Sequence, residues 1–132
     1  KHEQIYPEGG WVEHSPTEIW ENTQFVINEA VHNADIDASQ LAAIGVTNQR
    51  ETTVLWNAET GEPVHNAIVW QDRRTNDRVR ELKRDDWDET IRQKTGLEVD
   101  AYFSATKLEW LLENADVDAD DADDLAFGTI DS

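Results

Sequence analysis

The feature of the sequence that most limits the fold is a short apolar run, LAAIGVT, at residues 41–47, followed directly by polar side chains. An apolar run of this length without polar alternation is typical of a strand that is buried on both faces of an α/β sheet. In open α/β sheets, ligands bind beyond the carboxyl ends of the strands. The sequence therefore predicts a buried strand here and a binding site among the residues that follow it.

Capping signals predict a long helix before this strand. Ser15 is a good N-cap, Pro16 suits the first helical position, and Glu18 stands where it completes a capping box. We expect this helix to end near Asn33. Its apolar face is predicted from helical spacing to consist of Ile19, Thr23, Val26, Ile27, Ala30 and Val31.

Composition and turn residues predict the remaining elements. Gly96 is a candidate C-cap, and Ser104 is a candidate cap for a later helix. Lys107, Leu108, Leu111, Leu112 and Ala115 trace an amphipathic stripe along that later helix. We also expect a short strand at 2–6, a hairpin from 52–56 and 67–70, helices at 75–83 and 88–94, and a strand at 125–130. These elements predict an α/β or α+β body.

The charge of the chain limits the classes of partner that it can bind. It carries 29 acidic and 11 basic residues, a formal net charge of −18. A surface of this kind repels polyanions, so we expect no nucleic-acid partner. Its self-repulsion destabilises the compact state unless salt screens it. The pattern is typical of an intracellular protein of a salt-accumulating organism, and an acidic binding module such as a nucleic-acid mimic is the alternative.

Several kinds of site are excluded. The chain has no cysteine, so it has no disulfide and no thiolate site. No apolar run approaches the roughly 18 residues of a membrane span. The histidines lack the spacing of a zinc site, and no Gly-rich phosphate loop occurs. The acidic run from Asp116 resembles the start of a calcium loop, but Asp121 and Phe127 stand where Gly and Glu are required.

Three polar constellations are candidates for a site. In the first, Arg50 beside Glu51 is able to donate to one hydroxyl and accept from another, as a small polyol requires; a surface ion pair is the alternative. In the second, Trp70 offers an apolar wall to a sugar-like ligand, with Asp72 and Arg73 orienting neighbouring loops. A core Trp beside solvated charges is the alternative reading.

The third constellation spans residues 100–104, DAYFS. There the hydroxyl of Tyr102 stands next to a helix start. The alternative is simple packing of the Tyr ring beside a capping Ser. From composition and spacing alone, the sequence predicts only a small-ligand site on an α/β body.

These constellations, in this order and preceded by GWVEH at 10–14, resemble the FGGY family of carbohydrate kinases. The likeness runs over essentially the whole chain. It includes EQIYP at 3–7, AIGVTNQRETT at 43–53, NAIVWQDRRT at 66–75, KTGL at 94–97 and FGTID at 127–131. Related pentulose kinases share the WVE element and a similar W-x-D-x-R segment, whereas the NQRET string favours glycerol over sugars.

The resemblance implies that residues 1–132 form part of an actin-like, ribonuclease H-like N-terminal ATPase domain with an α/β fold. It implies transfer of the γ-phosphate of ATP, with Mg²⁺, to a terminal hydroxyl of glycerol. By motif, Arg50 and Glu51 hold glycerol hydroxyls, Trp70 forms the apolar wall, and Tyr102 adds a hydroxyl contact. Ala101 stands where the family usually has Pro, a departure expected to loosen the Tyr102 loop.

The resemblance also implies what lies outside this segment. The family's N-terminal phosphate hairpin, its general-base Asp and its C-terminal domain are all expected elsewhere in a longer parent. We therefore expect ATP and Mg²⁺ to bind those parts, no catalytic or metal-binding residue here, and no activity from the segment alone. The parent is expected to be a cytoplasmic homo-oligomer. Another FGGY polyol or ketose kinase, or a non-enzymatic acidic binding module, are the alternatives.

Overall fold

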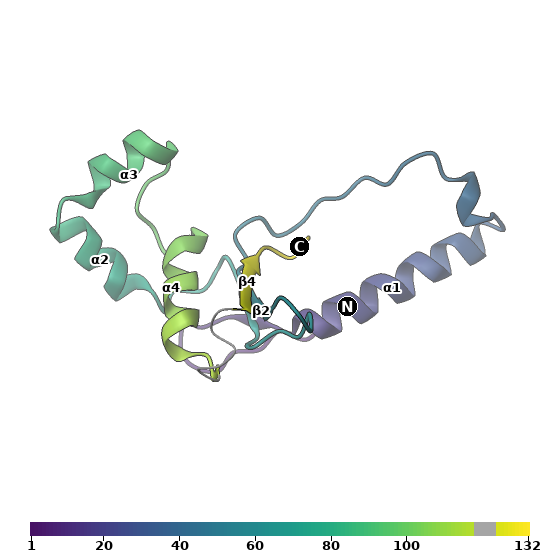
Figure 1. Ribbon diagram of the computed structural model, residues 1–132, viewed down its shortest axis with the longest axis horizontal. Coiled ribbons are helices and arrows are strands. Elements are labelled where there is room, and N and C mark those ends of the chain that lie inside the picture. Colours follow the sequence, from purple (N-terminus) through teal and green to yellow (C-terminus); the bar gives the residue numbers. More distant parts are fainter. Residues whose placement is uncertain (118–123) are drawn as a thin grey trace.

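The computed structural model describes residues 1–117 and 124–132. It is elongated, with two arms on either side of a small central body (Figure 1). Helix α1 (Pro16–Asn33) forms one arm, and α2 (Asn76–Arg84) with α3 (Trp87–Thr95) forms the other. Helix α4 (Ser104–Asn114) lies in the centre beside the strands. No helix among the described residues is long and apolar enough to cross a membrane.

The predicted start and end of α1 are confirmed, with one difference at its cap. The Ser15 hydroxyl accepts a hydrogen bond from the Glu18 backbone N–H at 3.2 Å. The Glu18 carboxylate does not return to the backbone of Ser15 as a capping box requires. It accepts instead from the backbone N–H of Glu3, at 3.1 and 3.2 Å. The second half of the box is thus replaced by a bond that ties the N-terminal segment to the helix.

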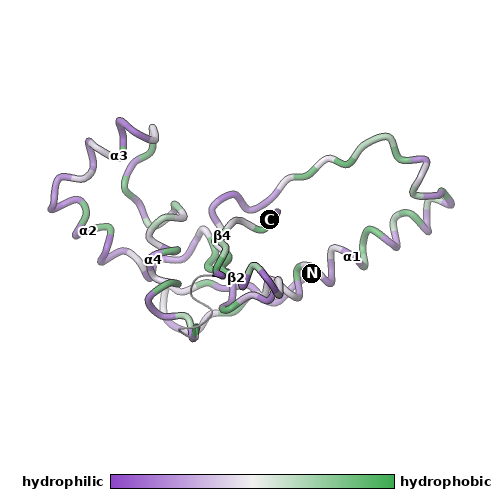
Figure 2. The backbone as a smooth tube through the Cα atoms, viewed as in Figure 1, coloured by the Kyte–Doolittle hydropathy of each residue, from purple (hydrophilic) through white to green (hydrophobic). Residues whose placement is uncertain are grey.

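The prediction of a buried strand at 41–47 is wrong for the described residues. The chain there is extended after a short 3-10 helix, η1 (Ala38–Gln40), but it pairs with no strand. Ile44 is 85% exposed and Val46 is 74% exposed. Figure 2 shows this hydrophobic stretch on the return path from α1, which itself has no buried residue. A buried strand needs neighbours on both sides, and none of the described elements provides them.

Two small antiparallel sheets form the centre. Strand β1 (Glu13–His14) pairs with β3 (Ala67–Ile68), and β2 (Val54–Asn57) pairs with β4 (Leu125–Gly128). The predicted hairpin between 52–56 and 67–70 is confirmed in part. Thr53 pairs with Ile68 through two backbone hydrogen bonds, and Trp56 forms a bridge to Pro63 across the turn at 57–61. The longer ladders of β2 and β3 are formed with other strands. The predicted strand at 2–6 is reduced to one bridge, Ile5 to Glu13.

The three later helices match their predictions closely. Gly96 ends α3 with φ +76°, the left-handed conformation that favours glycine at a C-cap. Helix α4 begins at Ser104, but Phe103 is its N-cap, so Ser104 does not cap the helix as predicted. Its hydroxyl has another partner, described below. The predicted stripe of α4 is only partly buried, since Leu111 is fully buried and Leu112 is 56% exposed.

Two separate apolar clusters hold the body together. The first contains Leu55 of β2, Ile68 of β3 and Leu111 of α4, so it joins both sheets to the central helix. The second contains Val79, Val99 and Ala101, and it joins α2 to the segment that leads into α4. The first cluster therefore holds the body of α4 against the strands, and the second holds the segment just before its N-terminus.

Candidate functional site

Glu51 links the first and third constellations. It follows the exposed extended segment and lies in a turn just before β2. Its Oε2 atom accepts hydrogen bonds from the backbone N–H of Ser104 at 3.0 Å and from the Ser104 hydroxyl at 2.7 Å. A carboxylate at a helix N-terminus is favoured by the helix dipole. Within the described residues its Oε1 atom has no hydrogen-bond partner, so one oxygen remains available to a ligand.

Trp70 and Tyr102 bring the second and third constellations together. Their ring centroids lie 5.8 Å apart with an interplanar angle of 61°, an edge-to-face contact. Trp70 is 38% exposed, and its backbone N–H donates to the hydroxyl of Thr52 at 3.3 Å. Since Thr52 adjoins Glu51, all three constellations meet near the start of α4. Neither Trp70 nor Tyr102 is a core residue, contrary to one alternative reading of the sequence.

Arg50 is the predicted site residue with the fewest contacts to the other three. Its side chain is exposed, and it makes no hydrogen bond or ion pair with the described residues. The guanidinium donors therefore face solvent, and the alternative of a surface ion pair at this position is not observed in the described part.

A buried lysine supports the turn that carries Tyr102. Lys107 of α4 is fully buried, and its Nζ donates to the carbonyl oxygens of Ala101 at 2.7 Å, Tyr102 at 2.5 Å and Phe103 at 3.1 Å. Burial lowers the pKa of Lys107 to about 8, while the nearby carboxylates of Glu51, Asp72 and Asp100 oppose that shift. The sequence places Lys107 in an amphipathic stripe with three leucines, and its position in that stripe is the only sequence signal of its burial.

Asp72 and Arg73 orient neighbouring loops, as predicted. Asp72 is buried and accepts from the backbone N–H of Val12 at 2.6 Å, while Arg73 pairs with Asp100 at 3.1 Å. Sequence reasoning missed Arg74, whose side chain is fully buried. Its Nη2 lies 2.7 Å from Glu13 Oε1 and 2.9 Å from Asp72 Oδ2.

The Arg74 guanidinium is also enclosed by aromatic rings. It lies 3.9 Å from the ring centroid of Trp11 and 4.4 Å from that of Trp110. Arg stacks on such faces because they carry negative charge density. These contacts attach the turn that follows Trp70 to the segment before α1. They therefore fix the backbone of the second constellation in place.

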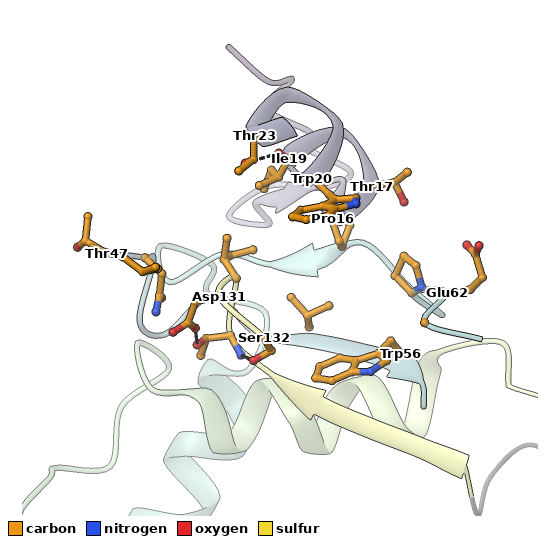
Figure 3. Close-up of a pocket in the computed structure, with 17 residues that line it drawn as sticks. Pro16, Thr17, Ile19, Trp20, Thr23, Thr47, Trp56, Glu62, Asp131 and Ser132 are labelled. Carbon is orange, nitrogen blue, oxygen red and sulfur yellow. Dashed lines mark hydrogen bonds between the residues drawn. The ribbon is translucent and has the colours of Figure 1, made fainter. Parts of the chain in front are cut away.

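A groove lies elsewhere in the molecule. It is a groove of about 770 Å³ between α1 and the β2–β4 pair, as Figure 3 shows. Ile19 and Trp20 form its upper wall, with Trp56 and Asp131 opposite. None of the four predicted site residues lines this groove. The candidate site is instead an open patch at the start of α4.

The acidic run examined as a calcium loop includes residues 118–123, which lie outside the described residues. Among the described residues, no three His, Asp or Glu side chains come close enough to hold a metal ion.

The described residues form a domain of helices and short antiparallel strands. Near the start of α4 it presents a carboxylate, an indole and a phenol, an arrangement suited to a small hydroxylated ligand. Comparison with known proteins gives the family directly. The model of the FGGY family of carbohydrate kinases, N-terminal domain, matches residues 1–132, and the chain belongs to that family. The fold class predicted from the sequence, an actin-like domain of these kinases, is thereby confirmed.

The relatives agree with this assignment. A glycerol kinase of Haloarcula marismortui is 66% identical over 116 residues, 88% of this chain and 23% of its own length. A glycerol kinase of Haloferax volcanii is 58% identical, covering 100% of this chain and 28% of its own. The chain thus spans about a quarter of the length of these relatives.

Solved structures give the same fold. The structure of Plasmodium falciparum glycerol kinase with ADP matches with a TM-score of 0.88 at 35% identity, over 99% of this chain and 27% of that one. A xylulose kinase from Rhodospirillum rubrum matches with a TM-score of 0.78 at 25% identity, over 98% and 27%.

Proposed function

We propose that residues 1–132 form part of the N-terminal domain of a longer kinase that phosphorylates glycerol with ATP. The observation that carries this proposal is the convergence of Glu51, Trp70 and Tyr102 at the start of α4. The names of the halophilic relatives, at 66% and 58% identity, support glycerol as the substrate.

Each of the four side chains makes a different contact with the three-carbon triol. We propose that Glu51 accepts from one hydroxyl through its free Oε1 atom, and that the Arg50 guanidinium donates to another. Trp70 covers the carbon chain, and the hydroxyl of Tyr102 adds a third polar contact. A site whose polar groups match substrate hydroxyls discriminates against analogues that lack one, since a polar group covered by the bound analogue is then left unpaired.

In phosphoryl transfer these residues orient the acceptor hydroxyl. The reaction depends on positioning and on stabilising charge around the transferred phosphoryl group. Residues 1–132 contain no Gly-rich phosphate loop. We therefore assign ATP, Mg²⁺ and the general base to the remainder of the longer protein; the ADP in the Plasmodium falciparum relative is consistent with ATP as the phosphoryl donor.

Glycerol binding is tested directly by titration of the 132-residue chain in molar KCl while tryptophan fluorescence is followed. We expect saturable quenching or enhancement, because Trp70 lies at the site and is partly exposed. The variants Trp70→Ala and Arg50→Ala should lose the saturable signal, whereas Trp87→Ala, an exposed Trp on the distant α3, should keep it. A linear response in all four proteins would refute the site.

Catalysis needs a second experiment. We expect no glycerol-dependent ADP release from the 132-residue chain. A chimera in which these residues replace the matching segment of the Haloferax volcanii relative should release ADP with glycerol, and Glu51→Gln should reduce its turnover at least tenfold. Turnover by the short chain, or a fully active Glu51→Gln chimera, would contradict the assignment.

The structural likeness to xylulose kinase makes a ketose kinase the second candidate. A substrate panel on the chimera, with glycerol and xylulose compared at equal concentration, separates the two. We also propose that the longer protein is a cytoplasmic homo-oligomer from a halophile, on the basis of the −18 charge and the haloarchaeal relatives.

A further inference from the structure

Lys107 of α4 is an unusual buried cation that contacts the turn before this helix. Lys107 is fully buried and donates to three consecutive carbonyl oxygens, those of residues 101–103. Burying an ammonium group is costly unless its hydrogen bonds are replaced. All three N–H donors of Lys107 have an acceptor, so the group is fully satisfied. An apolar side chain would fill the same volume at lower cost, so packing alone does not explain a lysine at this position.

The three acceptors belong to the turn that presents Tyr102. Its backbone N–H donates to Asp100 Oδ1 at 2.8 Å, which fixes the turn from the N-terminal side. Glu51 holds the other end through the backbone and hydroxyl of Ser104. Lys107 closes the remaining side from within the helix. The turn is therefore held at three points, and one of them, Glu51, is itself a proposed glycerol ligand.

Charges around Lys107 fit this arrangement. Glu51, Asp72 and Asp100 lie close enough to favour the ammonium form, and Arg73 opposes it. These groups come from the turn before β2, the turn after β3 and the segment before α4. The cation thus lies among carboxylates drawn from all three constellations and reduces the repulsion between them.

We propose that Lys107 is a positioning residue for the polyol site: it holds the 101–103 turn so that the Tyr102 hydroxyl meets a hydroxyl of the bound glycerol. The inference rests on the proposed glycerol site. Lys107 touches no ligand itself and acts only through Tyr102.

A double-mutant cycle on the 132-residue chain tests this, with glycerol titrations followed by tryptophan fluorescence. Tyr102→Phe should weaken glycerol binding about three- to tenfold, the effect of one hydrogen bond. Lys107→Met should weaken it to a similar extent, and the double variant should bind no worse than the weaker single variant. Lys107→Arg should recover part of the loss, because Arg keeps the charge and the N–H donors.

Controls keep the outcome interpretable. Lys83→Met, at an exposed lysine of α2, should bind glycerol as the unaltered chain does. Should Lys107→Met fail to fold, as judged by circular dichroism, the same cycle with Lys107→Arg is used, and additive effects there would overturn the proposal. Unchanged affinity in a folded Lys107→Met variant would also overturn it while leaving the glycerol site intact. Loss of glycerol binding by the unaltered chain would refute the glycerol site as well.

Discussion

At the scale of single residues, the feature whose stability depends most on complete charge pairing is the buried ionic cluster behind Trp70. Arg74 is held between two carboxylates and two indole rings, with its side chain fully buried. A buried pair adds little net stability when complete, but removing one partner leaves an uncompensated charge. The sequence indicated that Asp72 orients loops, but it did not reveal Arg74, because nothing in the string WQDRR distinguishes the buried arginine from the exposed one.

The two neighbouring arginines allow a matched comparison. Arg74→Ala should lower the free energy of unfolding by about 3–5 kcal/mol, since Glu13 and Asp72 would remain buried without their cation. Arg73→Ala should cost less than about 1 kcal/mol, because its pair with Asp100 is half exposed. Urea unfolding in constant KCl measures both. Equal losses for the two variants would show that burial of Arg74 does not govern the cluster.

The lowered pKa of Lys107 predicts how the free energy of unfolding changes in alkaline solution. Its pKa is about 8 in the folded chain and 10.5 as the ordinary value. Between these values the unfolded chain binds more protons than the folded one, so the free energy of unfolding should rise from pH 8 to pH 10.5. Urea unfolding at several pH values checks this. Lys107→Arg should lack this rise, since Arg stays protonated throughout, and an identical profile for both proteins would contradict the assignment.

At the scale of elements, helix ends and the 57–61 turn were predictable, whereas strand partners distant in the sequence were not. The limits of α1 depend on local chemistry, namely the Ser15 hydroxyl, the Pro16 ring and the backbone behind them. The pairing of β2 with β4 joins segments some seventy residues apart, and no local signal encodes such a choice. The same applies to the site: its residues were found from motifs, whereas the Glu51–Ser104 contact required the fold.

The end of α3 offers a test at this scale. Gly96 has φ +76°, so Gly96→Ala should lower the free energy of unfolding by about 1–2 kcal/mol through backbone strain. Gly45→Ala is the matched control, because Gly45 has ordinary φ and open space around it. Thermal unfolding of both variants gives the comparison. A harmless substitution at Gly96 would mean that the helix end rearranges freely.

At the scale of the whole molecule, the acidic surface dominates. A net charge of −18 on 132 residues produces repulsion that counterions must screen. This property was readable from composition, as was the family from its motifs. What composition could not give is the arrangement of exposed apolar surface, since that depends on which elements meet.

Salt should therefore stabilise the chain. The melting temperature is expected to rise steadily from low salt to molar KCl, as measured by circular dichroism. A variant with three exposed acids changed to amides, Glu21→Gln, Glu29→Gln and Glu113→Gln, should show a smaller rise because less repulsion remains. A flat or falling melting temperature in the unaltered chain would count against adaptation to salt.

The extended segment at 41–47 has a consequence for handling the protein. Its backbone from residue 42 to 48 makes no hydrogen bonds with the described residues, and its aliphatic side chains face water. An extended segment with unpaired backbone groups allows a second copy of the chain to pair with it as a β-strand. Ile44→Lys should thus raise the concentration at which light scattering first increases, most visibly in high salt, where the shielding that stabilises each molecule also lets neighbours approach.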